Sequence, residues 1–272
     1  MQEILDFNYK EQGKDNFINR KHTHTYYFEM LHIHSGSGII MVNDRLFPIK
    51  KDTIVLINGI DTHCSVPDDP SKYERSKLVI SNALIQNIAE ITGASDMIRD
   101  LFIDTNGICI ELRPEETALI DAEMRKIRDY LKTESIYQKT NIMLSVFKIL
   151  ICAHKNMHHY ASTIDNKMSD VLHYLNTNID RKITLEELCS QFHISKYYLC
   201  HTFKNTIGMT IFDYILARRI SIAARKLLYT EDSLAEIALS TGFSSFSYFS
   251  KMFKEFEGVS PKDFRKANSS ST

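Results

Sequence analysis

The chain has 272 residues, with 33 lysines and arginines against 34 aspartates and glutamates, and 43% of its residues are hydrophobic. This composition excludes intrinsic disorder and collagen-like structure. Five scattered cysteines without a Cys-x-x-Cys pair exclude a disulfide scaffold and a zinc module. Residues 1–16 lack the apolar core of a signal peptide, and no segment is apolar enough to span a bilayer. We therefore expect a cytoplasmic protein with no membrane partner.

Residues 26–81 are dense in β-branched and aromatic runs, which are separated by Gly, Asn and Asp turn residues. Short strands at this spacing predict an all-β sandwich or a small barrel. The expected strands are 27–34, 39–42, 46–49, 53–57 and 77–81.

From residue 83 the apolar spacing becomes helical. Leu84, Ile88 and Ile91 recur at i, i+4 and i+7, and Gly93 follows where a helix C-cap would lie. A last strand is expected at 108–112. The sequence therefore predicts that the strands give way to a mainly helical middle segment.

Two helices are predicted in this middle segment. Pro114 opens the first, on which Ile120, Met124, Ile127 and Leu131 form one apolar stripe. The second, at about 140–154, is apolar on almost every side. Such a helix is buried either in the core or against another subunit, and both interpretations stay open.

The C-terminal part contains an internal repeat at a spacing of about fifty residues. Thr184 and Ser233 are N-cap residues, each followed three positions later by a glutamate, Glu187 or Glu236. A turn and a second capped helix follow in each copy. This pattern predicts two helix-turn-helix units, at about 183–204 and 233–254, joined by one long helix at 211–229.

Each second helix has two core anchors at i, i+4: Leu199 with Phe203, and Phe249 with Phe253. Removing the anchors leaves one outward stripe on each helix. An α-helix fits the major groove, where such side chains can hydrogen-bond base edges, although a merely solvated face is the alternative. The candidate DNA-binding residues are Lys196, Tyr197, Cys200, His201, Lys204, Phe246, Ser247, Ser250, Lys251 and Lys254.

The segment from about residue 168 to 267 resembles the DNA-binding domain of the AraC/XylS family of bacterial transcription regulators. The resemblance lies in residues 184–208, 214–228, 237–243 and 248–265. It implies seven helices with two helix-turn-helix units, promoter DNA as the partner, and activation through RNA polymerase as the commoner mode. Cys189 and His193 depart mildly from the alanine and glycine that are usual there.

The N-terminal histidines have a related pattern. His22, His24, Glu29 and Gly36 have the spacing of the first cupin motif, which resembles sensor domains of many members of this family. The second motif is degraded, although His63 is present. We expect His22, His24, Glu29 and His63 to bind a small-molecule effector, such as a sugar or another metabolite. A structural role and a three-nitrogen, one-oxygen metal site are the alternatives.

Other histidine pairs carry less information. His32 and His34 share one face of a strand, and His154 and His158 lie at i, i+4 without a third ligand. We find no catalytic Ser/His/Asp set, phosphate-binding loop or dinucleotide fingerprint. We therefore expect neither an enzyme nor a cofactor.

Together these patterns predict a multidomain α+β protein. A cupin-like β-barrel sensor is expected at 1–112, a helical dimerisation region and linker at 113–166, and an all-α DNA-binding domain at 167–272. The last of these holds 14 basic and 11 acidic residues, so the near-neutral total conceals a mildly basic DNA-binding part.

The predicted function is a sequence-specific DNA-binding transcription regulator, a ligand-responsive activator that acts as a homodimer. Each chain would read two successive major grooves. The alternatives are a metal-dependent cupin enzyme with a DNA-binding appendage, and a regulator whose N-terminal domain binds only a protein partner.

Overall fold

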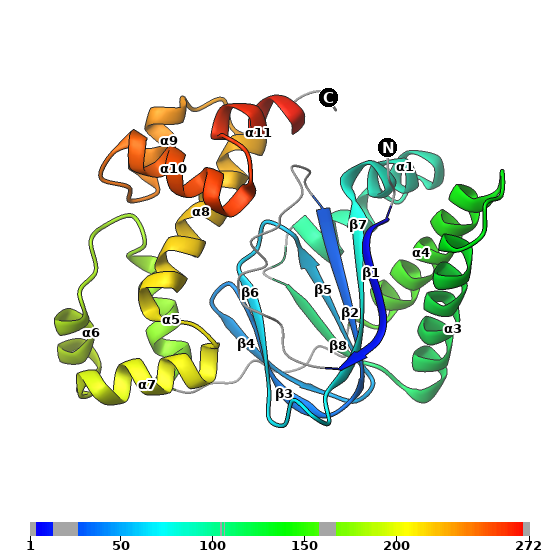
Figure 1. Cartoon of the computed structure of the whole chain (residues 1–272), viewed down its shortest axis with the longest axis horizontal. Coiled ribbons are helices and arrows are strands. Elements are labelled where there is room, and N and C mark those ends of the chain that lie inside the picture. The colour runs from blue at the N-terminus through cyan, green and yellow to red at the C-terminus, as the bar shows by residue number, and fades with distance from the viewer. Residues whose placement is uncertain (1–3, 13–26, 104, 106, 158–166, 269–272) are drawn as a thin grey trace.

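A computed structural model describes residues 4–12, 27–103, 105, 107–157 and 167–268. Its N-terminal part is β-rich and its C-terminal part is entirely helical, which confirms the predicted fold class (Figure 1). The strands are β1 (Ile4–Gln12), β2 (Tyr27–Ser35), β3 (Ser37–Val42), β4 (Arg45–Lys50), β5 (Thr53–Asn58), β6 (His63–Pro67), β7 (Glu74–Ser81) and β8 (Ile108–Glu111).

The strands form two antiparallel sheets. One has the order β1-β7-β2-β5-β8, and the other has the order β4-β3-β6. Alternation along β2 turns Leu31 and Ile33 toward the second sheet, while Met30 and His32 lie on the opposite face. The apolar core between the two sheets consists of Leu31, Ile33, Ile40, Val42, Phe47, Ile49, Val55, Ile57, Tyr73 and Cys109.

Helices cover the outer face of the five-stranded sheet, on the right of Figure 1. These elements are α1 (Asn82–Thr92), α2 (Ser95–Ile98), the π-helix η1 (Arg99–Ile103), α3 (Pro114–Leu131) and α4 (Gln138–Lys155). Gly93 ends α1 in the left-handed conformation, with φ of 67°, as predicted.

Two residues of the predicted apolar patterns are not buried like the others. The side chains of Ile91 and Leu131 are 69% and 40% exposed. Both lie in the last turn of a helix, beyond the residues that pack on the sheet. The rest of the predicted α3 stripe, Ile120, Met124 and Ile127, is fully buried.

The C-terminal part consists of seven helices among the described residues, the number that the resemblance implies. They are α5 (Lys167–Thr177), α6 (Leu185–Phe192), α7 (Lys196–Ile207), α8 (Ile211–Tyr229), α9 (Leu234–Ser240), α10 (Phe246–Glu257) and α11 (Pro261–Asn268). In Figure 1, α8 connects the α6–α7 unit to the α9–α10 unit. No helix in the described part of the chain has the length and apolarity needed to cross a membrane.

The C-terminal helices pack against the outer face of the three-stranded sheet. Met41, Leu46 and Cys64 of that sheet belong to the same buried cluster as Phe203 and Tyr214. The molecule is therefore layered, from α3 and α4 through the two sheets to the helix-turn-helix part (Figure 1).

Candidate DNA-binding surface and effector site

Local sequence signals set the geometry of both helix-turn-helix units. The Thr184 hydroxyl caps α6 by accepting a hydrogen bond from the Glu187 amide at 3.2 Å, and Ser233 caps α9 in a full capping box with Glu236. The turn of the first unit contains His193 in the left-handed region, with φ of 53°. The histidine thus adopts the conformation for which glycine is usual at this turn.

Gly242 fills the turn of the second unit, with φ of 84°. A Cβ atom at this position would lie 2.7 Å from the carbonyl oxygen of Ile179. Both the backbone conformation and the close approach therefore require glycine here.

The four predicted anchors hold α7 and α10, the second helices of the two units, in place. Leu199, Phe203, Phe249 and Phe253 are all fully buried. The ring of Phe203 packs edge-on against Tyr214 of α8, with ring centroids 5.8 Å apart. The buried sides of both helices are therefore those that the sequence predicts.

The ten candidate DNA-binding residues lie outside the core. Nine are exposed and Ser250 is half-buried. The ring of Tyr197, 79% exposed, stacks on His201 with centroids 5.6 Å apart. The structure thus presents each group of five on an accessible side of its helix, where DNA contact remains our prediction.

Lysines and arginines have different roles in this domain. Three arginines of α8 are used within the protein: Arg218 bonds Asn43 and Asn176, Arg219 bonds the Ile179 carbonyl, and Arg225 bonds Asp61. Lys196 lies 3.4 Å from Glu186 in an exposed ion pair. Lys204, Lys251 and Lys254 have no ion pair among the described residues. These three lysines are therefore available for contact with DNA.

Asn205 also lies on the first stripe, although it is not among the residues predicted from the sequence. Its side-chain amide lies 3.2 Å from His201 Nδ1, one turn further along α7, and the residue is exposed. Asparagine can bond adenine through two atoms in the major groove. The i, i+4 spacing from His201 was the signal that could have found it.

Glu29 and His63 meet at the edge of the core between the two sheets. Their atoms Oε2 and Nε2 lie 3.6 Å apart, and Glu29 is buried. His63 Nδ1 donates a hydrogen bond to the Asp61 carbonyl oxygen at 2.8 Å. The other two residues of the predicted set, His22 and His24, lie outside the described residues.

Two buried cations that the sequence argument missed join this site. Arg75 and Lys77 alternate along β7 on the face shared with Glu29, and Lys77 Nζ lies 2.7 Å from Asp6 Oδ2. Charges at alternate positions of an otherwise apolar strand were the available signal. We call Glu29, His63, Arg75 and Lys77 the inner polar cluster.

The inner polar cluster keeps Glu29 ionised. Burial alone would raise the pKa of this carboxyl group, but His63, Lys77 and Arg75 together lower the pKa below its usual value. Burial likewise opposes the charge of Lys77, whereas Asp6 and Glu29 raise its pKa. The cluster therefore offers both hydrogen-bond donors and acceptors to a polar molecule. Among the described residues of the predicted metal set, only Glu29 and His63 could provide ligand atoms.

Polar contacts join the edge of this cluster to α8. The Asp61 carboxylate is fully buried and pairs with Arg225. The Tyr214 hydroxyl donates to the Asn43 carbonyl oxygen at 2.9 Å, and Arg218 donates to the Asn43 side-chain oxygen at 2.8 Å. Asp61 thus contacts His63 through its backbone and α8 through its side chain.

Both parts of the chain match known protein families. Residues 5–121 match the family model of the AraC-like ligand binding domain, and residues 188–267 match that of a helix-turn-helix domain. The HTH-type transcriptional activator RhaR of Mannheimia succiniciproducens is 28% identical over 247 residues, covering 87% of this chain and 84% of RhaR. The similarity to RhaR thus extends over both matched regions of this chain.

Two further matches differ in extent. The uncharacterized HTH-type transcriptional regulator YdiP of Escherichia coli K12 is 38% identical over 102 residues, which span 38% of this chain and 34% of YdiP. The structure of ToxT from Vibrio cholerae aligns over 97% of this chain and 98% of that chain, with a TM-score of 0.41 and 18% identity. On the domain matches and the similarity to RhaR, this chain belongs to the AraC family of helix-turn-helix transcriptional regulators.

Proposed function

We propose that this regulator reads promoter DNA in the cytoplasm with α7 and α10 in successive major grooves. The observation that supports this most is the presence of two exposed stripes at opposite ends of α8. This helix has 19 residues and is about 28 Å long at ~1.5 Å per residue. That length approaches one turn of duplex DNA, about 34 Å.

Single substitutions in the stripes test this proposal. His201→Ala and Lys251→Ala should each weaken specific promoter binding by about 1–3 kcal/mol, because each removes one polar group from a different groove. Binding is measured at one fixed salt concentration. The melting curve of both variants should match that of the parent.

Two matched variants serve as controls. Lys132→Ala removes an exposed lysine just after α3, and His173→Ala removes an exposed histidine of α5. Both should bind like the parent. Equal binding by the parent, His201→Ala and Lys251→Ala would exclude those two residues from DNA recognition.

The effector site proposed here is the inner polar cluster. A neutral, hydroxyl-rich metabolite such as a sugar suits a site that contains Arg75 and Lys77 beside an ionised Glu29. We propose a binding role and no catalysis for this part of the chain. The effector would act by binding more tightly to one arrangement of the two domains than to the other.

A thermal-shift screen against sugars and organic acids tests the effector site. A ligand at 100 times its dissociation constant should stabilise the parent by about 2.7 kcal/mol. Glu29→Gln should abolish the shift, because it removes the buried acceptor charge. Glu111 has an exposed carboxylate that pairs with Lys50 at 2.9 Å, so Glu111→Gln should retain the thermal shift. A ligand that stabilises both variants equally would place the effector elsewhere.

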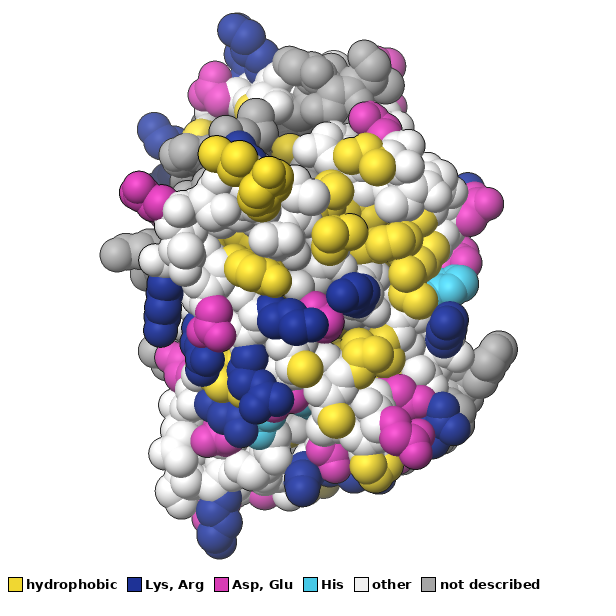
Figure 2. Space-filling model, turned by 90° about the vertical axis from the view of Figure 1, so that its right-hand side faces the viewer, with side chains coloured by type: hydrophobic (Ala, Val, Ile, Leu, Met, Phe, Trp, Pro, Cys, Tyr) yellow, Lys and Arg dark blue, Asp and Glu magenta, His cyan; other side chains and the backbone are white. Residues whose placement is uncertain are grey.

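The outer side of α3 and α4 is the proposed homodimer surface. Exposed apolar side chains gather on this side of the molecule, which Figure 2 shows face-on: Leu119, Leu131, Ile136, Tyr137 and Leu144. Such a patch suits a partner subunit better than water. RNA polymerase is the remaining proposed partner, because the regulator is proposed to be an activator.

Sedimentation measures the oligomeric state. The parent should be a dimer, and Ile136→Asp with Leu144→Asp should make it a monomer, because two charges would be buried at the interface. Leu239→Asp, at a leucine of α9 that is 66% exposed, should leave the dimer intact. A dimer that survives the double substitution would contradict this surface.

A further inference from the structure

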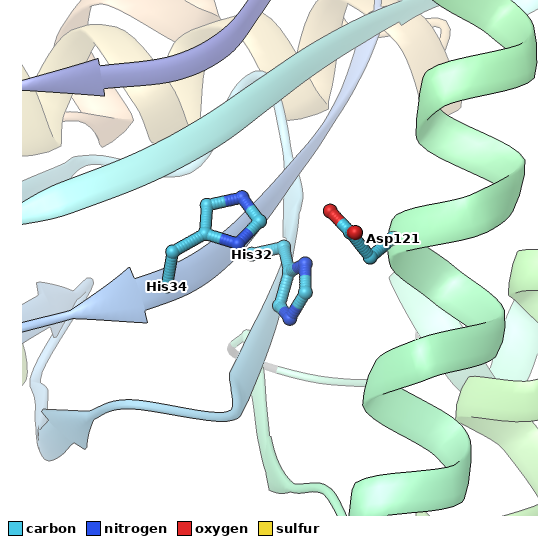
Figure 3. Close-up of side chains that lie close together, drawn as sticks. All are labelled: His32, His34 and Asp121. Carbon is cyan, nitrogen blue, oxygen red and sulfur yellow. The ribbon is translucent and has the colours of Figure 1, made fainter.

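A second histidine cluster lies on the opposite face of the five-stranded sheet from the inner polar cluster. His32 and His34 of β2 lie beneath α3, and Asp121 of α3 points toward them (Figure 3). One candidate ligand atom from each residue lies within 4.8 Å of the others. Two imidazoles and a carboxylate form a donor set that binds divalent transition metals.

His32 is the unusual member of this cluster. Its side chain is fully buried, and neither ring nitrogen has a hydrogen-bond partner among the described residues. An unsatisfied buried polar group costs about 1–3 kcal/mol, so such a group requires an explanation. Burial also lowers the pKa of His32 to about 4, which keeps the imidazole neutral with a free lone pair. That is the form in which histidine binds metal.

The other two residues are oriented by neighbours, as metal ligands commonly are. His34 Nε2 lies 2.7 Å from the Ser76 hydroxyl, which leaves Nδ1 as the ligand atom. The Tyr9 hydroxyl donates to Asp121 Oδ1 at 2.8 Å, and Arg125 lies 3.4 Å from Oδ2. Ser76 of β7 thus orients His34, and Tyr9 of β1 and Arg125 of α3 orient Asp121. Both side chains are held near His32.

The geometry is close to that of a bound ion. Ligands about 2.0–2.1 Å from a tetrahedral zinc are roughly 3.4 Å apart, so atoms that lie within 4.8 Å of one another need to approach by at most about 1.4 Å. His34 and Asp121 are only half-buried, which leaves access for a water molecule as the fourth ligand. Lys10, Arg125 and Arg128 lie nearby and oppose a cation, so the carboxylate is essential to the site.

We propose that His32, His34 and Asp121 bind one divalent transition-metal ion of the zinc class. The ion would tie β2 to α3, whose opposite side carries part of the exposed apolar surface of Figure 2. This site is separate from the proposed effector site and does not depend on it.

Calorimetric titration of the metal-free full chain with Zn²⁺ tests the proposal. The parent should bind one ion at this site, and His34→Gln and Asp121→Asn should each lose at least tenfold in affinity for it. Both substitutions lie at half-buried positions, and circular dichroism checks that the variants fold. Zn²⁺ should raise the melting temperature of the parent and not that of either variant.

Two controls separate this site from other histidines. His154→Gln removes a histidine that pairs with Asp100 at 3.3 Å, and His63→Gln removes the histidine of the inner polar cluster. Both should bind Zn²⁺ like the parent. Anomalous diffraction from a zinc-soaked crystal should show a peak between His32, His34 and Asp121. Unchanged affinity in His34→Gln and Asp121→Asn, or loss in His63→Gln with a peak beside Glu29, would overturn the proposal.

Discussion

Phe203→Ala should lower the free energy of unfolding of the helix-turn-helix domain by about 3–5 kcal/mol. The Phe203 side chain is fully buried and packs edge-on against Tyr214, which itself bonds Asn43 of the other domain. Truncation removes this packing and leaves a cavity beneath the first recognition helix. Urea unfolding of the full chain, followed by far-ultraviolet circular dichroism, measures the loss.

Phe212→Ala is the matched control for Phe203→Ala. Phe212 lies on α8 and is 56% exposed, so its truncation should change stability by no more than about 0.5 kcal/mol. A Phe203→Ala variant as stable as Phe212→Ala would contradict the assignment of Phe203 as a core anchor.

Arg225→Ala should weaken the contact between the two domains by about 3–5 kcal/mol. The Asp61 carboxylate is fully buried, and its Oδ2 atom has no hydrogen-bond partner among the described residues. Without Arg225 this charge stays buried and uncompensated. Hydrogen exchange should therefore accelerate in α8 and in residues 58–63.

The neighbouring Lys226→Ala variant provides the comparison. Lys226 pairs with Asp232 at 3.8 Å near the surface, and loss of such a pair costs about 0–1 kcal/mol. Adding Asp61→Ala to Arg225→Ala should restore part of the lost stability, because it removes the uncompensated charge. Equal exchange rates in the parent and in Arg225→Ala would show that this ion pair does not hold the domains together.

Sequence reasoning succeeded where the signals are local. The capping residues Thr184 and Ser233 and the anchor Phe203 act within a few residues of their own helix, so their spacing predicts the helices and their buried faces. The strand β1 was missed, because Ile4–Gln12 is a half-exposed edge strand with a polar composition. It is held by backbone pairing with β7, which leaves little apolar periodicity.

The contacts between distant elements were beyond sequence reasoning. Tyr214 bonds Asn43 across 171 positions of the chain, and no local pattern predicts such a contact. His32 and His34 were predicted to share a face, yet Asp121 joins them only because α3 packs on that face. Glu29 and His63 were predicted to come together and do so, whereas the burial of Arg75 beside them depends on how β7 pairs with β2.

Selection of DNA from a random pool by the full chain tests the central claim most directly, namely that both helix-turn-helix units read DNA. The selected sequences should contain two half-sites about 10 base pairs apart for each chain. His201→Ala should relax sequence preference in one half-site and Lys251→Ala in the other. A single half-site, or two half-sites that both variants affect equally, would contradict the assignment of α7 and α10 to successive grooves.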